Sequence, residues 1–279
     1  MKESRQGNAG YLDYFPFAKK TREQIEHDVT ELGFQQAAAR IVNRVAENKL
    51  VVEGKDEEVE EILGSRPVIV IANHPSFAEI ITTVASLEPR DDIYLIGISN
   101  FLGIGPNFSK HVIPVYGTNQ TASEGYKLPI RIGDALRFGP KVQYENAHER
   151  NIRSIRNAAE IVNQGSLIVM FPEGIQSGKD KKWLNGIGYL VAGIEKRFST
   201  YLIFAYPEGT SNTDYIRLIP GIRKLLPKTS VTFSSPRTIK DSLGDITDPR
   251  VVTKKIEDEY IAWTNSVVKK DKFTRINNP

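Results

Sequence analysis

Residues 67–79 read PVIVIANHPSFAE, in which six apolar residues give way at once to polar ones. The apolar half is rich in β-branched side chains, a pattern typical of a strand that is buried on both faces. The residues from Ser76 to Leu87 then follow a helical pattern. A buried strand that turns directly into a helix is the unit from which parallel α/β sheets are built, so this stretch predicts that class of fold.

The same alternation continues toward the C-terminus. Further strands are predicted at residues 92–98, 112–116, 166–171 and 200–206, with helices at 149–164 and 183–198. We therefore expect an α/β fold with a mixed, centrally parallel sheet flanked by helices. Later strands, at 215–219 and 230–234, are expected to add antiparallel edges.

The N-terminal part has a different character. We expect residues 1–65 to form an arm and a helical segment, and residues 66–279 to form the α/β domain, which ends in a helix over 251–270. Apolar residues recur with a helical period over 21–52, which predicts a helix there. Residues 1–18 are rich in aromatic side chains, and two interpretations stay open: an arm packed on the core, or an anchor at a membrane surface.

The composition excludes several classes of function. Of the 279 residues, 40% are hydrophobic, 25% are charged and none is cysteine, which excludes disulfides, thiol nucleophiles and Cys-ligated metals. The net charge of +3 is small for a nucleic-acid binder, and no phosphate-binding loop, serine elbow or zinc-binding helix motif is present. The four histidines lie far apart in the sequence, and we expect neither a metal nor a cofactor.

The sequence shows no segment for membrane insertion. Its apolar runs are far shorter than the ~18 residues that suggest a membrane span, and its N-terminus lacks the apolar core of a signal peptide. We therefore expect a cytoplasmic protein, and any membrane contact should be peripheral, at the inner face of the membrane.

The polar end of the opening stretch is the first candidate site. His74 follows a predicted strand, and ligands of parallel sheets bind at the carboxyl ends of the strands. A histidine can act as a general base near neutral pH, and Glu79 can fold back to orient its ring. Two other interpretations remain: His74 as a turn residue bonded to backbone, and Ser76 with Glu79 as a helix capping box.

The second candidate site is Phe-Pro-Glu-Gly at residues 171–174, again where a predicted strand ends. Proline ends the strand ladder and Gly174 frees the backbone, so Glu173 should be held at the rim of the sheet near the His74 turn. The alternative is a solvated glutamate at an ordinary strand exit.

Taken together, Asn-His-x4-acid after one strand and Phe-Pro-Glu-Gly after another resemble the glycerolipid acyltransferase family. That family includes the glycerol-3-phosphate and lysophosphatidic acid acyltransferases, and the resemblance covers residues 66–206. It implies an α/β sheet flanked by helices. It also implies acyl transfer from acyl-CoA or acyl carrier protein to a hydroxyl, without an acyl-enzyme.

The resemblance also implies roles for individual residues. His74 would deprotonate the acceptor hydroxyl, and Glu79 would orient the imidazole ring of His74. These two are therefore the expected catalytic residues. A basic pair in the region of Lys110 and His111 binds phosphate in the plastid-type enzymes, although an exposed lysine beside a packed histidine is the alternative here. The expected substrate-binding residues are Asn73, Ser76, Lys110, His111, Glu173 and Gly174.

The sequence departs from the family pattern at three places. The acid is Glu79 rather than aspartate, Gln176 stands where arginine is frequent, and the run over 111–117 has no arginine at its end. The arginine that Gln176 replaces is a residue suited to gripping phosphate bidentately. Two other groups of basic residues could bind an anionic partner. One is Lys179, Lys181 and Lys182, and the other is the stretch over 215–240, which has basic but no acidic residues. For both groups, the alternative is an ordinary solvated surface.

Three hypotheses follow for the function. The first is an acyltransferase that takes an acyl thioester as donor and glycerol 3-phosphate or a lysophospholipid as acceptor. The second keeps this chemistry and changes the acceptor to an amine, a sugar or another polar lipid. The third is a lipid-binding protein without catalysis. A nucleic-acid partner is not expected.

Overall fold

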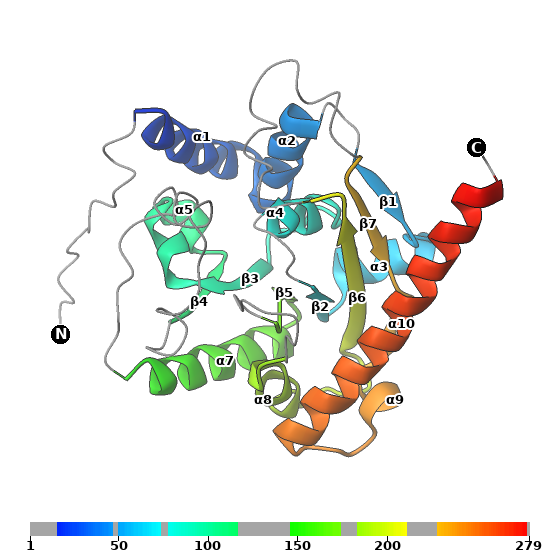
Figure 1. Cartoon of the computed structure of the whole chain (residues 1–279). Coiled ribbons are helices and arrows are strands. Elements are labelled where there is room, and N and C mark those ends of the chain that lie inside the picture. Colours follow the sequence, from blue (N-terminus) through cyan, green and yellow to red (C-terminus); the bar gives the residue numbers. More distant parts are fainter. Residues whose placement is uncertain are drawn as a thin grey trace, which may run out of the picture.

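The structure, a computed structural model, describes residues 16–46, 50–73, 78–116, 146–173, 183–210 and 228–277. Their strands form one sheet in the order β1-β7-β6-β2-β5-β3-β4, and β8 pairs with β6 (Figure 1). The strands are β1 (Val51–Glu53), β2 (Val68–Ala72), β3 (Ile93–Ile98), β4 (Val112–Val115), β5 (Leu167–Met170), β6 (Tyr201–Glu208), β7 (Ser230–Phe233) and β8 (Arg237–Thr238).

The centre of this sheet is parallel, as the sequence predicts. Strands β6, β2, β5, β3 and β4 run parallel to one another. The later strands β7 and β8 run antiparallel to β6, and β1 pairs in parallel with β7. The expected α/β fold with a mixed, centrally parallel sheet flanked by helices is therefore confirmed.

The middle strand β2 is buried along its whole length. Val68 and Val70 face one hydrophobic cluster, whereas Ile69 and Ile71 face the cluster on the other side of the sheet. The neighbouring strand β5 is equally buried. Strands covered on both faces read as continuous apolar runs, which is why the sequence pattern located both of them.

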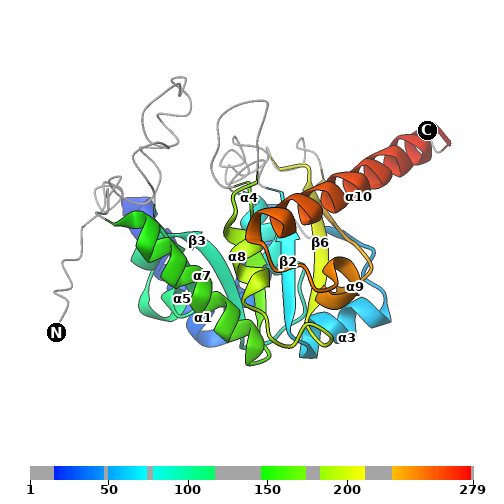
Figure 2. The same ribbon diagram turned by 90° about the horizontal axis from the view of Figure 1, so that it is seen from below.

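Helices cover the two faces of the sheet as separate layers (Figures 1 and 2). One layer holds α1 (Pro16–Leu32), α2 (Phe34–Ala46), α3 (Glu57–Ser65), α4 (Ala78–Ala85), the 3-10 turn η2 (Ser99–Gly103) and α5 (Pro106–Ser109). The other holds α7 (Ala147–Asn163), α8 (Gly186–Ala192), α9 (Ile239–Leu243) and α10 (Pro249–Asn277). The far end of α10 projects past the sheet (Figure 2).

The single helix predicted over 21–52 is wrong, because the chain turns between two helices at Gly33. This glycine has a φ of +85°, a left-handed conformation that residues with a side chain rarely adopt. After the turn, the Gln35 side chain donates hydrogen bonds of 2.9 and 2.8 Å to the carbonyls of Ala85 and Leu87 at the end of α4. The described helices of residues 1–65 thus share a hydrophobic core with the sheet. The strand β1, also from this part of the chain, extends the sheet by pairing with β7.

Smaller differences concern lengths. The helix predicted over 183–198 is reduced to α8, because the chain turns at Gly193, where a Cβ would lie 2.8 Å from that of Ala159 on α7. The strand β1 was not predicted. The strand predicted over 215–219 and residues 1–15 of the aromatic arm lie outside the described residues.

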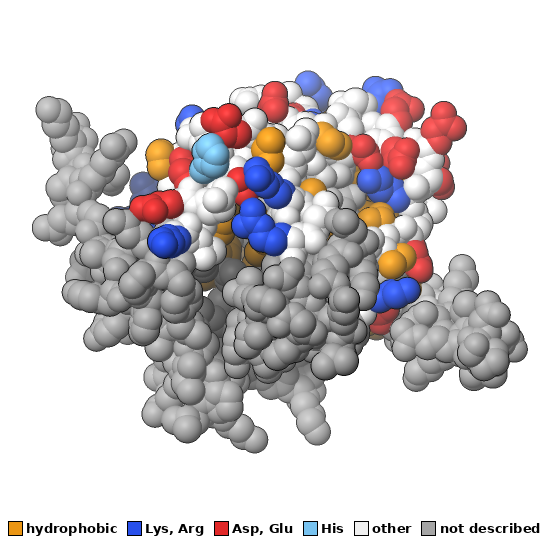
Figure 3. All heavy atoms as spheres, turned by 90° about the horizontal axis from the view of Figure 1, so that it is seen from above, with side chains coloured by type: hydrophobic (Ala, Val, Ile, Leu, Met, Phe, Trp, Pro, Cys, Tyr) orange, Lys and Arg blue, Asp and Glu red, His pale blue; other side chains and the backbone are white. Residues whose placement is uncertain are grey.

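Two features of the described residues bear on membrane contact: the hydropathy of the helices and the distribution of charge on the surface. None of the helices in the part of the chain that the structure describes is long and apolar enough to cross a membrane. On the face shown in Figure 3, acidic and basic side chains are interspersed among isolated hydrophobic ones.

Candidate active site

The candidate site lies at the edge of the sheet where β2, β5 and β6 end. In the parallel register, Ala72 is paired with Ala205, and Ile71 with Met170. Asn73 directly follows β2, and Glu173 follows β5 after a short turn. The two sequence motifs therefore leave neighbouring strands at the same edge, as expected. His74, Ser76 and Gly174 lie outside the described residues.

Asn73 is held by a residue from the far end of the chain. Its backbone N–H donates to the hydroxyl oxygen of Tyr260 on α10 over 3.0 Å. The same hydroxyl lies 3.1 Å from Asn73 Oδ1 and 3.1 Å from the carbonyl oxygen of Ala205 in β6. A single hydroxyl thus joins the end of β2 to β6.

Glu79 is in the first turn of α4 and is 0% exposed. An ionised carboxylate is costly to bury unless hydrogen bonds or a cation compensate it, so complete burial is unusual for a residue of this type. The helix itself packs between α2 and the sheet. Glu79 is therefore carried by a helix on one face of the sheet, whereas Tyr260 is carried by a helix on the other face.

Glu173 lies close enough to Tyr260 to act on it electrostatically. The pKa of the Tyr260 hydroxyl is raised well above 10, first by burial and then by the negative charge of Glu173 and by Tyr206, against the hydrogen bond from Asn73. Tyr260 thus stays protonated at ordinary pH. Nothing in the sequence marked it, because it occupies a regular apolar position of a helix.

Lys110 and His111 lie at the other end of the strands, where β3 and β4 begin. His111 precedes β4, and its Nδ1 donates to the carbonyl oxygen of Ile93, the first residue of β3, over 2.8 Å. Its ring stacks on Phe34 at 4.7 Å, while Lys110 bonds to the side chain of Asn107. The structure does not bring this pair together with Asn73 and Glu173, and the arrangement matches the alternative of an exposed lysine beside a packed histidine.

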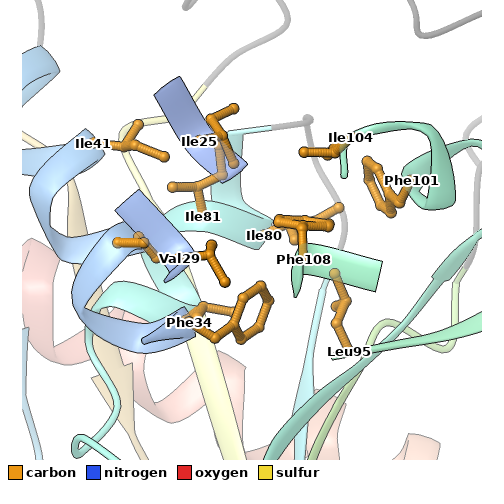
Figure 4. Close-up of a pocket in the computed structure, with 13 residues that line it drawn as sticks. Ile25, Val29, Phe34, Ile41, Ile80, Ile81, Leu95, Phe101, Ile104 and Phe108 are labelled. Atoms are coloured by element: carbon orange, nitrogen blue, oxygen red, sulfur yellow. The ribbon is translucent and has the colours of Figure 1, made fainter. Parts of the chain in front are cut away.

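An apolar cavity of about 70 Å³ lies between α4 and the N-terminal helices (Figure 4). The side chains of Ile80, Ile81 and Val84 bring α4, the helix of Glu79, into its wall. Phe101 and Ile104, which follow the carboxyl end of β3, line it as well. The remaining lining residues are Ile25, Val29, Phe34, Ala37, Ala38, Ile41, Leu95 and Phe108. The sequence did not locate this cavity, because its walls come from segments far apart.

The basic stretch over 215–240 is only partly described. Where it is, Arg237 pairs with Glu259 at 3.3 Å and lies over the ring of Phe204, and Lys240 pairs with Asp245. Arg217, Arg223 and Lys224 lie outside the described residues, as do Lys179, Lys181, Lys182 and Gln176. No group of three or more potential metal ligands occurs among the side chains that the structure describes.

The described residues form an α/β protein in which Asn73 and Glu173, from the two sequence motifs, follow the carboxyl ends of adjacent parallel strands. No protein-family model and no curated protein matches the chain. Among solved structures, it is similar to the crystal structure of the 1-acyl-sn-glycerophosphate (LPA) acyltransferase PlsC from Thermotoga maritima. The likeness covers 92% of this chain and 94% of that chain, with 14% sequence identity and a TM-score of 0.44. A likeness this distant does not identify the reaction, so the function has to be inferred from the chain's own residues.

Proposed function

We propose that the protein is an acyltransferase that moves a fatty acyl chain from a thioester to a hydroxyl group at this edge of the sheet. One observation carries the proposal: the Asn73 and Glu173 motifs, about a hundred residues apart in the chain, leave adjacent parallel strands at one edge, where Asn73 bonds to Tyr260 and the charge of Glu173 raises the pKa of the Tyr260 hydroxyl. The complete burial of Glu79, in the first turn of the next helix, gives further support.

The chemistry assigned to this site is general base catalysis. His74 takes the proton of the acceptor hydroxyl while the acceptor oxygen attacks the thioester carbonyl carbon, and Glu79 stabilises the imidazolium that forms. The tetrahedral intermediate then collapses: the carbon–sulfur bond breaks, and the imidazolium returns the proton to the leaving thiolate. The products are an ester and a free thiol, and no bond to the enzyme forms. Glu173 and Gly174 would hold the acceptor, with Asn73 and Ser76 beside it.

The apolar cavity is the proposed site of the acyl chain. Its lining is entirely apolar, and it shares α4 with Glu79. At about 70 Å³ it is well below the roughly 300 Å³ or more of sites that enclose drug-sized ligands. We therefore expect α1 and α2 to move away from α4 when a long acyl chain enters.

The acceptor we propose first is glycerol 3-phosphate or a lysophospholipid, with acyl-CoA or acyl carrier protein as donor and no further cofactor. Gln176, in place of an arginine, favours a second candidate, in which an amine, a sugar or another polar lipid is the acceptor. In either case we propose a cytoplasmic enzyme that reaches its lipid by peripheral contact with the membrane.

The test is thiol release from long-chain acyl-CoA with glycerol 3-phosphate, with lysophosphatidic acid and with no acceptor. Wild type is compared with His74→Ala and with His148→Ala, in which an exposed histidine on α7 is removed as a control. Acceptor-dependent release that is lost only in His74→Ala supports the proposal. Release that is equal in all three proteins, or that needs no acceptor, contradicts it.

A further inference from the structure

The hydroxyl of Tyr260 is the feature that the proposed chemistry leaves without a role. It accepts the backbone N–H of Asn73 at 3.0 Å and has a single proton to share between Asn73 Oδ1 and the Ala205 carbonyl, each at 3.1 Å. Tyr260 and Asn73 are 187 residues apart in the sequence. The residue that follows Asn73 is His74, the proposed base, so this contact acts on the backbone that carries the base.

The ring of Tyr260 is fixed on several sides. It packs against Trp183 and Phe204 with ring centroids 5.3 Å apart in each case, and against Trp263 at 5.8 Å. Only 4% of the residue is exposed. Tightly packed aromatic rings have few alternative rotamers, so the hydroxyl has a defined position from which to hold Asn73.

The Tyr260 hydroxyl also stays uncharged. Burial and the nearby charge of Glu173 keep its pKa well above 10, so it remains protonated and neutral in the pH range in which His74 would work. A buried hydroxyl that bonds to Asn73 and to the Ala205 carbonyl is well placed to hold these neighbours in position.

We propose that Tyr260 is a positioning residue that sets the place of the His74 base by fixing Asn73 to β6 and α10. The proposal rests on the acyltransferase function proposed above. If the anchor is lost, the motif backbone gains freedom, and a misplacement of about 1 Å at a reacting group can cost about 100-fold in rate. The loss should therefore appear in kcat, whereas binding of the acyl donor in its separate cavity should be kept.

The test compares Tyr260→Phe with Ser234→Ala. The first removes only the hydroxyl oxygen and keeps the ring. The second removes another buried hydroxyl, which accepts the backbone N–H of Phe204 in β6 at 2.9 Å without contacting Asn73. Each variant loses one accepted and one donated hydrogen bond, worth about 1 kcal/mol each, so similar decreases in Tm are expected. Only Tyr260→Phe should lower kcat, by about 10- to 100-fold, with the KM for the acyl donor within about twofold of wild type.

Hydrogen exchange provides a readout that does not depend on turnover. The amide of Asn73 and the peptides that continue from it should exchange faster in Tyr260→Phe than in Ser234→Ala. If wild type transfers no acyl group to any acceptor, the proposed function fails and the positioning of a base fails with it, whereas faster exchange would then show only that Tyr260 anchors the backbone of Asn73. A folded Tyr260→Phe with wild-type kcat, or with unchanged exchange at Asn73, would overturn the proposal.

Discussion

Replacing Glu79 by glutamine separates the catalytic role of this residue from a purely structural one. The side chain keeps its size, and glutamine serves in a capping box as well as glutamate does. If Glu79 only caps the helix, both activity and stability should therefore survive. If Glu79 stabilises the imidazolium of His74, the substitution removes the negative charge that this cation needs, and the rate should fall.

The burial of Glu79 sets the size of the expected effect. Because the residue is 0% exposed, an effective dielectric constant of ~20 applies rather than the ~80 of water. For charges ~4 Å apart this gives ~4 kcal/mol, as opposed to ~1 kcal/mol for an exposed pair. The first value corresponds to about 10³-fold in rate and the second to only about fivefold.

The assay is the kcat for acceptor-dependent thiol release, measured beside the Tm of each protein. Glu149→Gln is the matched control, because Glu149 is an exposed glutamate in the first turn of α7. We expect Glu79→Gln to lose about 10³-fold in kcat with a nearly unchanged Tm, and the control to change neither. Activity within about twofold of wild type would refute the catalytic role and leave the capping box as the explanation of Glu79.

Three further predictions follow from the same contacts. Glu173→Ala should raise the KM for the acceptor by about tenfold and change kcat less, in line with lost binding of about 1.4 kcal/mol; a collapse of kcat with an unchanged KM would instead place Glu173 in the chemistry. Val84→Phe should fill the apolar cavity at a cost of about 1–3 kcal/mol in stability and slow the reaction of long-chain acyl-CoA, but not that of a short-chain donor; equal losses with both donors would argue against an acyl site there. Arg90→Ala should lower the Tm by several degrees, because Arg90 donates to Asp92 and to three backbone carbonyls at the ends of α3 and α7. Arg90 holds the pKa of Asp92 below its usual 3.8, so this pair stabilises the fold above that pH and the contribution is lost as the pH falls through the lowered pKa. When the free energy of unfolding is measured as the pH is lowered, Arg90→Ala should lack the loss of stability that comes from protonating Asp92. The same pH dependence in the variant and in wild type would show that the pair contributes little.

The sequence was informative wherever a short segment determines its own environment. The runs over β2 and β5 had to be buried on both faces, and the polar residues after them had to lie at one edge, because parallel strands end on the same side. The position of His111 was predictable by the same rule: it stands before a strand rather than after one, so it belongs to the opposite edge.

Features that depend on distant contacts were not predictable. The turn at Gly33 interrupts a helical pattern that continues on both sides of it. The strand β1 is three exposed residues whose pairing with β7 depends on where that strand lies. Tyr260 continues the apolar periodicity of Val252 and Ile256 in α10, and its hydrogen bonds to Asn73 and Ala205, which come from distant parts of the chain, distinguish it from them.

The connection between Asn73 and Tyr260 also sets an order of events during synthesis. A ribosome adds about 5–20 residues per second, so the 187 residues that separate the two partners take about 10 to 40 s to make. In the last part of that interval the nascent chain contains β2, β5 and β6, but its Asn73 has no tyrosine hydroxyl to bind and the Phe204 ring lacks its cover from α10. The nascent chain should therefore expose apolar surface at the edge that holds Asn73, and a chaperone that binds this surface would protect that edge until the last helix docks.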